Sequence, residues 1–135
     1  MNCIRYRDGY RYQLANTYQV KTGVFPGRDL HSEYVHLSME GLLTISYGYA
    51  WDGPSGPTFD TKSTLRGSLV HDALYQLIRL GLLPASFRLR ADQVAYRIWR
   101  EDGMNPARAW LWRFALNKFA APAARVGDKM VLVAP

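Results

Sequence analysis

The first fifty residues alternate between apolar and polar side chains, which is the spacing of β-strands that bury one face. The expected strands are 4–7, 10–13, 18–24, 34–38 and 42–46. Asp8-Gly9 separates the first two strands, and Glu40-Gly41 separates the last two. Because glycine readily adopts the positive φ of tight turns, both pairs predict antiparallel hairpins.

The apolar spacing becomes helical after residue 60. The expected helices are 65–80, 90–102 and a third that runs from Pro106 until Pro122. Gly81 and Gly103 end the first two helices, and Asn105 is placed to cap the third helix just before Pro106. A last short strand is expected at 130–133.

These elements predict a single α+β domain of 135 residues, with a small N-terminal antiparallel β-sheet followed by three α-helices. The first two helices are joined by about nine residues, so we expect them to form an antiparallel pair. The domain divides into a β-rich part (1–50), a Gly/Pro loop (51–60), a helical part (61–121) and a tail with a short strand (122–135). Long irregular segments between regular elements often carry function, which directs attention to the Gly/Pro loop.

The composition indicates an ordinary globular protein, since 48% of the residues are apolar and 21% are charged. A single cysteine, Cys3, rules out an intramolecular disulfide. We find no apolar leader and no apolar run long enough to span a bilayer, so we expect a soluble chain that is not exported. The net charge of +6 favours an anionic partner, such as nucleic acid, a phospholipid surface or an acidic protein.

His71 lies in the middle of the first expected helix, in the apolar run TLRGSLVHDALYQLI at 64–78. The residues that share its helical face are Leu74, Tyr75 and Ile78. The imidazole is therefore expected on the buried stripe, with the neighbouring Asp72 at the edge of that stripe. Buried polar groups are costly unless they are hydrogen-bonded or bound to a metal, so His71 needs either a structural partner or a chemical task.

Asp92 is a candidate partner, because it shares a face of the second expected helix with apolar and aromatic residues. Antiparallel packing of the two helices can bring Asp92 against His71. A carboxylate on one imidazole nitrogen fixes the tautomer and leaves the other nitrogen free as a base. The alternative is a buried hydrogen bond, joined by Tyr75, that only holds the helices together. Asp72 has no role in such a contact, but it is a ready ligand for a hard cation.

Three motifs occur in the order found in phospholipase A2 enzymes: DGPSGPTFD at 52–60, HDALY at 71–75 and RADQVAYRIW at 90–99. In that family a glycine-rich calcium loop precedes a His-Asp-x-x-Tyr helix, and an antiparallel helix supplies a second aspartate. The chain most closely resembles the disulfide-free version found in parvovirus capsid proteins. It departs from the secreted enzymes at Pro54 and Pro57, where they use mainly glycine and cysteine.

The phospholipase resemblance implies a role for each residue of a His71-Asp92 dyad and for Tyr75 beside it. His71 would deprotonate water, Asp92 would orient His71, and Tyr75 would hydrogen-bond Asp92. The implied activity is calcium-dependent hydrolysis of phospholipid esters at a membrane surface, and a basic protein would approach anionic phospholipid readily.

The same resemblance implies a calcium site next to the dyad. Asp72 would bind the ion together with backbone carbonyls of the loop, for which Gly53 and Gly56 are the best matches. Asp52 and Asp60 are further candidate residues in that loop. Calcium takes several oxygen ligands, and a flexible glycine loop can supply carbonyl oxygens.

The chain is also similar, over about residues 15 to 120, to a family of small tailed-phage and prophage proteins of the domain of unknown function 1353 type. The shared features are a Val-His-Asp-x-Leu-Tyr helix, an Ala-Asp-x-x-aromatic helix and a basic aromatic third helix. This resemblance implies a location in the host cytoplasm or the phage particle, but it implies no activity. The alternative function is therefore a non-enzymatic phage accessory or virion-associated protein, with a structural His-Asp-Tyr contact and a basic face that binds a phage or host protein.

Nucleic acid is a less favoured partner, and the sequence does not indicate an oligomeric state. Arg5, Arg7 and Arg11 alternate with tyrosines, as in proteins that grip single strands. Half-exposed strands, with tyrosines packed and arginines in water, produce the same pattern more often.

Three further features of the sequence have simple structural explanations. His31 and His36 do not have the spacing of a helical metal motif, so no transition-metal site is expected there. Trp110 and Trp112 cannot both face one core, so one of them is expected at the surface. The third helix has a basic side formed by Arg108, Arg113, Lys118 and Arg125, for which a solvated face is the default explanation.

Overall fold

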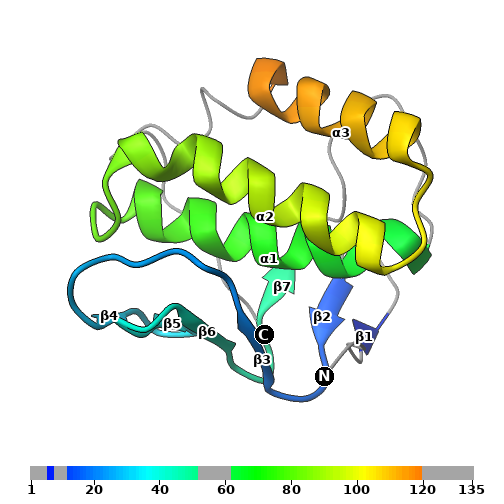
Figure 1. Cartoon of the computed structure of the whole chain (residues 1–135). Coiled ribbons are helices and arrows are strands. Elements are labelled where there is room, and N and C mark those ends of the chain that lie inside the picture. Colours follow the sequence, from blue (N-terminus) through cyan, green and yellow to red (C-terminus); the bar gives the residue numbers. More distant parts are fainter. Residues whose placement is uncertain (1–5, 8–11, 52–61, 120–135) are drawn as a thin grey trace.

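The strands of the chain form two small antiparallel sheets that lie on one side of the helices (Figure 1). The computed structural model describes residues 6–7, 12–51 and 62–119. Within this part of the chain all strands precede all helices. The expected α+β class, with strands first and three α-helices after them, is therefore confirmed.

The strands are β1 (Tyr6–Arg7), β2 (Tyr12–Leu14), β3 (Tyr18–Lys21), β4 (Leu30–His31), β5 (Val35–Leu37), β6 (Leu42–Ile45) and β7 (Ala50–Trp51). One sheet has the order β1-β2-β7 and the other β3-β6-β5-β4, and all neighbours are antiparallel. Burial alternates along β5, where Val35 and Leu37 are buried and His36 is exposed. Gly41 has a φ of +88° at the β5–β6 turn, which explains why glycine is needed there.

The helices are α1 (Lys62–Arg79), α2 (Arg88–Glu101) and α3 (Pro106–Phe119), with a 3₁₀ turn, η1 (Ala85–Phe87), before α2. Gly81, with a φ of +77°, follows the end of α1, as the sequence predicts. The side chain of Asn105 accepts a hydrogen bond from the backbone N–H of Ala107 at 2.8 Å. The predicted N-cap of α3 is therefore confirmed.

The helices α1 and α2 form the expected antiparallel pair. Near the start of α1 the carbonyl of Thr64 accepts a hydrogen bond from Trp99 Nε1, near the end of α2, at 3.1 Å. Gly67 allows this close approach, because a Cβ at that position would lie 2.4 Å from the same Nε1 atom. The absence of a side chain at one position therefore sets the spacing of the helix pair.

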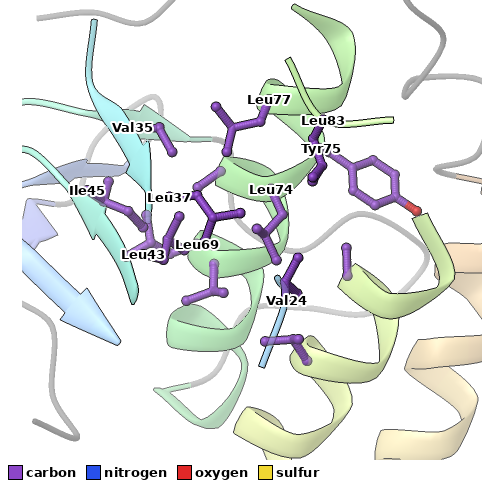
Figure 2. Close-up of a cluster of buried hydrophobic side chains, with 14 of the residues drawn as sticks. Val24, Val35, Leu37, Leu43, Ile45, Leu69, Leu74, Tyr75, Leu77 and Leu83 are labelled. Atoms are coloured by element: carbon purple, nitrogen blue, oxygen red, sulfur yellow. The ribbon is translucent and has the colours of Figure 1, made fainter. Parts of the chain in front are cut away.

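The main core lies between α1 and the larger sheet. Figure 2 shows Leu69, Leu74 and Leu77 of α1 turned toward the strands that carry Leu37 and Leu43. Tyr75 leaves this cluster in the other direction, and its hydroxyl oxygen reaches toward α2 (Figure 2). One helix thus supplies both the apolar core and a polar contact on its opposite side.

The structure corrects some of the expected boundaries. The strands β4 and β7 were not predicted, because two residues are too few to show an alternating pattern, and β7 lies where an irregular loop was expected. α1 begins at Lys62 rather than Leu65, and α2 at Arg88 rather than Arg90, because apolar spacing marks where a helix is buried and not where it starts. The strands β1 and β2 pair as predicted, but the register joins Arg7 to Gln13, so their connection is longer than a two-residue turn at Asp8-Gly9. The predicted strand at 130–133 lies outside the described residues.

Candidate functional site

His71 and Tyr75 of α1 meet Asp92 of α2 in one cluster, as the sequence predicted. Nε2 of His71 lies 2.6 Å from Oδ1 of Asp92, and the hydroxyl of Tyr75 donates to the same oxygen at 2.8 Å. Since a carboxylate only accepts hydrogen bonds, Nε2 carries a proton in this contact, and in the neutral imidazole Nδ1 is then the nitrogen with a lone pair. The two rings are one helical turn apart, with centroids 4.0 Å from each other. The cluster therefore holds the imidazole in one tautomer and one orientation.

The His71–Tyr75–Asp92 cluster is deeply buried. The exposed fraction is 3% for His71, 2% for Tyr75 and 0% for Asp92. Burial strengthens hydrogen bonds to a charged group, and it makes the loss of a partner costly. The pairing is therefore well defined, but little of the imidazole reaches solvent.

Two buried polar atoms beside the cluster lack hydrogen-bond partners among the described residues. They are Oδ2 of Asp92 and Nε of Arg88, one helical turn earlier on α2. Buried polar atoms are rarely left unpaired in folded proteins, and an unpaired atom often marks a place for water, an ion or a ligand. The carboxylate thus has acceptor capacity beyond what the contact between the helices uses.

Tyr75 is held in its neutral form by its surroundings. Burial raises the pKa of Tyr75 well above its usual value, and the negative charge of Asp92 and the hydrogen bond to it act in the same direction. The hydroxyl therefore remains a proton donor to Asp92 throughout the neutral pH range. This supports the role predicted for Tyr75, which is to fix the carboxylate.

Asp72 follows His71 on α1 and is half-buried, at the edge of the stripe as expected. The loop residues predicted to complete a calcium site, Gly53, Gly56, Asp52 and Asp60, lie outside the described residues. Within residues 6–7, 12–51 and 62–119, no three or more His, Cys, Asp or Glu side chains are grouped so that they could hold a metal ion. Since calcium takes six to eight oxygen ligands, Asp72 could supply only a small part of a site.

A second polar cluster, which the sequence did not lead us to expect, surrounds Arg66 near the start of α1. Its guanidinium donates to Asp102 at 2.9 and 3.0 Å, to Glu101 at 2.8 Å and to the hydroxyl of Tyr18 at 2.7 Å. Burial alone would lower the pKa of Arg66, but the hydrogen bonds to Asp102, Tyr18 and Glu101 outweigh it and raise the pKa. The cluster joins α1, the end of α2 and β3. The signal in the sequence was an arginine in an apolar helix opposite a Glu-Asp pair at the end of the next helix.

A pocket of about 390 Å³ lies next to Arg66. Its lining residues are Gln19, Val20, Lys21, Leu42, Arg66, Arg97 and Glu101. Although three of these carry positive charge, Arg66 is bound by carboxylates, and Arg97 donates to the carbonyl of Lys21 at 2.8 Å. The pocket includes no residue of the His71–Tyr75–Asp92 cluster, so it does not lead to the candidate base.

The remaining candidates are placed as follows. His31 and His36 are exposed cross-strand partners, with ring centroids 4.6 Å apart. Trp112 is buried against Trp99, whereas Trp110 is exposed. The prediction that these two tryptophans could not share one core is therefore confirmed.

Comparison with models of protein families, with curated proteins and with solved structures finds no match to this chain. The resemblance to phospholipase A2 enzymes and to the phage family therefore stays an expectation drawn from the sequence motifs. In the part of the chain that the structure describes, every helix is too short or too polar to cross a membrane.

Proposed function

We propose that this protein is a phage-encoded, phospholipase A2-like hydrolase that requires calcium and cleaves phospholipid esters at a membrane surface. The observation that carries the proposal is the 2.6 Å contact between Nε2 of His71 and Oδ1 of Asp92. This contact leaves Nδ1 of His71 as a base whose orientation is fixed by a buried carboxylate, and Tyr75 in turn fixes that carboxylate.

In the proposed reaction, Nδ1 of His71 accepts a proton from water while the water oxygen attacks the ester carbonyl. The bond between the carbonyl carbon and the alkoxy oxygen then breaks, and the imidazolium returns the proton to the leaving oxygen. Ester and water become a carboxylic acid and an alcohol, with no further reactant. Asp92 stabilises the transient imidazolium through Nε2. Calcium bound beside Asp72 would supply positive charge for the developing oxyanion.

Access is the most demanding requirement of this proposal. His71 is 3% exposed, so an ester can reach Nδ1 only through a local opening beside α1. The unpaired Oδ2 of Asp92 and Nε of Arg88 support a role beyond helix packing, because a purely structural contact gains nothing from leaving them without partners.

The same burial favours a second candidate function. A cluster with almost no exposed surface is what a structural contact between two helices requires. In that case the protein would be a non-enzymatic phage accessory or virion-associated protein. It would act by binding a phage or host protein through its basic face.

Two substitutions separate the candidates. We expect His71→Gln and Asp92→Asn to lower the rate of ester hydrolysis by about 10² to 10⁴-fold, because the first removes the general base and the second removes the carboxylate that orients it. The measurement is fatty acid release from phosphatidylglycerol vesicles, in calcium and in chelator, together with the melting temperature of each variant. His36→Gln, at an exposed histidine outside the cluster, is the matched control.

Loss of hydrolysis in variants that are still folded at the assay temperature would support the enzyme, even where loss of the buried contact lowers the melting temperature. If the parent releases no fatty acid at any calcium concentration, and the two substitutions change only the melting temperature, the structural alternative is correct. Hydrolysis that survives in His71→Gln would show that a different group provides the base.

A further inference from the structure

The outer face of α3, formed by Trp110, Leu111 and Phe114, is an exposed apolar surface. These side chains are 56%, 59% and 48% exposed. The rings of Trp110 and Phe114 stack with centroids 5.7 Å apart and planes 10° from parallel. Apolar side chains of this size seldom gather on a surface without a function.

The opposite face of α3 already provides its packing within the fold. Ala109 and Trp112 are buried, and Trp112 lies against Trp99 of α2. α3 packs on α2 and is the helix farthest from the two sheets (Figure 1). The outer face therefore contributes nothing to the described core, and its position at one side of the molecule suits contact with an extended surface.

The charged residues of α3 itself are all basic. The segment 106–119 contains no aspartate or glutamate. At 100° per residue, Arg108 and Arg113 fall on opposite margins of the stripe that Trp110 and Phe114 occupy. The guanidinium of Arg113 lies 5.9 Å from the ring centre of Tyr96 on α2, so this arginine lies at the margin of the outer face where α3 meets α2. Apolar side chains flanked by arginines are typical of helices that lie in a membrane interface.

The identity of the partner follows from this combination. A second copy of the chain would bring its own arginines against Arg108 and Arg113, and the net charge of +6 opposes such pairing. A nucleic acid would engage the arginines and the rings but would leave Leu111 without an apolar environment. An anionic phospholipid surface accommodates all three kinds of group, since it offers phosphates above an acyl layer.

We propose that the outer face of α3 binds the protein to anionic phospholipid membranes. Trp110, Leu111 and Phe114 enter the boundary between headgroups and acyl chains, and Arg108 and Arg113 contact lipid phosphates. The inference deepens the proposed function and rests on it for the choice of phospholipid as ligand, but binding itself requires neither calcium nor His71.

The test is co-sedimentation of the full chain with vesicles of phosphatidylcholine alone or mixed with phosphatidylglycerol, in chelator so that hydrolysis is suppressed. We expect tight binding only to the anionic vesicles. The double variant Trp110→Ser/Leu111→Ser should bind at least about tenfold more weakly, since it removes two side chains that enter the interface. The matched control is Leu80→Ser/Leu89→Ser, which changes two exposed leucines outside α3.

The charge contribution is tested separately. Arg108→Glu should weaken binding to anionic vesicles and reduce its dependence on salt, whereas Arg28→Glu, an exposed arginine in the β-rich part, should change binding much less. Melting temperatures of all variants are expected to match the parent, because the replaced side chains are exposed or half-exposed.

The proposal is overturned if the parent ignores anionic vesicles, if it binds neutral vesicles equally well, or if the two double variants weaken binding to the same extent. A dimer that becomes monomeric in Trp110→Ser/Leu111→Ser, with no vesicle binding by the parent, would instead show that α3 joins two copies. Hydrolysis of a dispersed short-chain phospholipid without vesicle binding would leave the enzyme proposal intact and reject this inference. Binding to anionic vesicles without hydrolysis of any phospholipid would support this inference and reject the enzyme proposal.

Discussion

At the scale of single residues, one oxygen of Asp92 accepts both hydrogen bonds of the buried cluster, and the other accepts none among the described residues. His71 and Tyr75 therefore share one acceptor oxygen, and each limits how the other can move. In the proposed reaction, the hydroxyl of Tyr75 would keep the carboxylate in place while His71 accepts and returns a proton. This makes Tyr75 a positioning residue, whose effect on chemistry and on stability can be measured separately.

We expect Tyr75→Phe to lower the free energy of unfolding by about 1.5 to 3 kcal/mol, because it removes a buried hydrogen bond to a charged group. Under the enzyme proposal it should also lower the hydrolysis rate while leaving His71 as the base. The measurements are urea unfolding and the rate of fatty acid release. Tyr47→Phe, at an exposed tyrosine, should change neither. Unchanged unfolding in Tyr75→Phe would contradict the importance of this hydrogen bond.

The raised pKa of Tyr75 also predicts a pH dependence of stability. Because the folded pKa lies above the unfolded value of about 10, the contribution of neutral Tyr75 is complete below pH 10 and is lost as the pH rises above it. Unfolding free energies measured at alkaline pH should therefore fall more steeply in the parent than in Tyr75→Phe. Equal slopes in the two proteins would show that Tyr75 does not titrate as its burial requires.

Replacing Arg66 tests whether the stability that the second polar cluster provides depends on the geometry of the guanidinium or only on its positive charge. Arg66→Lys keeps the positive charge, but one ammonium group cannot donate to Asp102, Glu101 and Tyr18 with the same spacing. We expect a loss of about 2 kcal/mol in the free energy of unfolding, measured in urea. Arg28→Lys, at an exposed position, is the control. If Arg66→Lys and Arg28→Lys lower the free energy of unfolding by the same amount, the positive charge alone is enough to stabilise the cluster.

At the scale of elements, the spacing between α1 and α2 depends on Gly67. A Cβ there would lie 2.4 Å from Nε1 and 2.5 Å from Cδ1 of Trp99, and this ring cannot move without losing its hydrogen bond to Thr64. Gly67→Ala should lower the free energy of unfolding by about 1 to 3 kcal/mol. Alanine would otherwise favour the helix by about 1 kcal/mol, so the sign of the change decides between steric overlap and helix propensity.

The matched experiment combines Gly67→Ala with Trp99→Leu. In the leucine background the overlap is removed, and Gly67→Ala should become neutral or stabilising. A double-mutant cycle in thermal or urea unfolding measures this coupling. If Gly67→Ala destabilises both backgrounds equally, the close approach of the two helices does not depend on the contact with Trp99.

At the scale of the whole molecule, the helical half was more predictable than the β-rich half. The helices carry local signals in the sequence, such as apolar residues at helical spacing and caps at Asn105 and Gly81. The contact between His71 and Asp92 could be predicted because the face of each residue and the short connection between the helices left few alternatives. In the β-rich half, β7 pairs with β2, although the two strands lie far apart in the sequence. A strand of two residues contains no periodic signal that could indicate this pairing.

The cluster around Arg66 was missed for a related reason. Its members come from β3, α1 and the end of α2, so no sequence spacing connects them. The burial of Arg66 was also not evident, because arginine within a helix is usually exposed. Contacts between two neighbouring helices can be inferred from helical faces, whereas contacts among three elements require knowledge of how the sheet packs on the helices.

Under the proposed function, calcium binding should appear as a property of the folded molecule as a whole. An ion that binds only the folded chain raises the free energy of unfolding by about 2.7 kcal/mol at one hundred times its dissociation constant. We therefore expect the melting temperature of the parent to rise with calcium concentration, and Asp72→Asn to remove most of that rise. Comparing the calcium-dependent rise, rather than the melting temperature in chelator, separates ligation from any structural role of Asp72.

Glu33→Gln removes an exposed carboxylate between β4 and β5 and should leave the rise unchanged. A rise of the same size in Asp72→Asn would show that Asp72 is not a ligand, and the calcium-dependent part of the proposed reaction would then have to be abandoned.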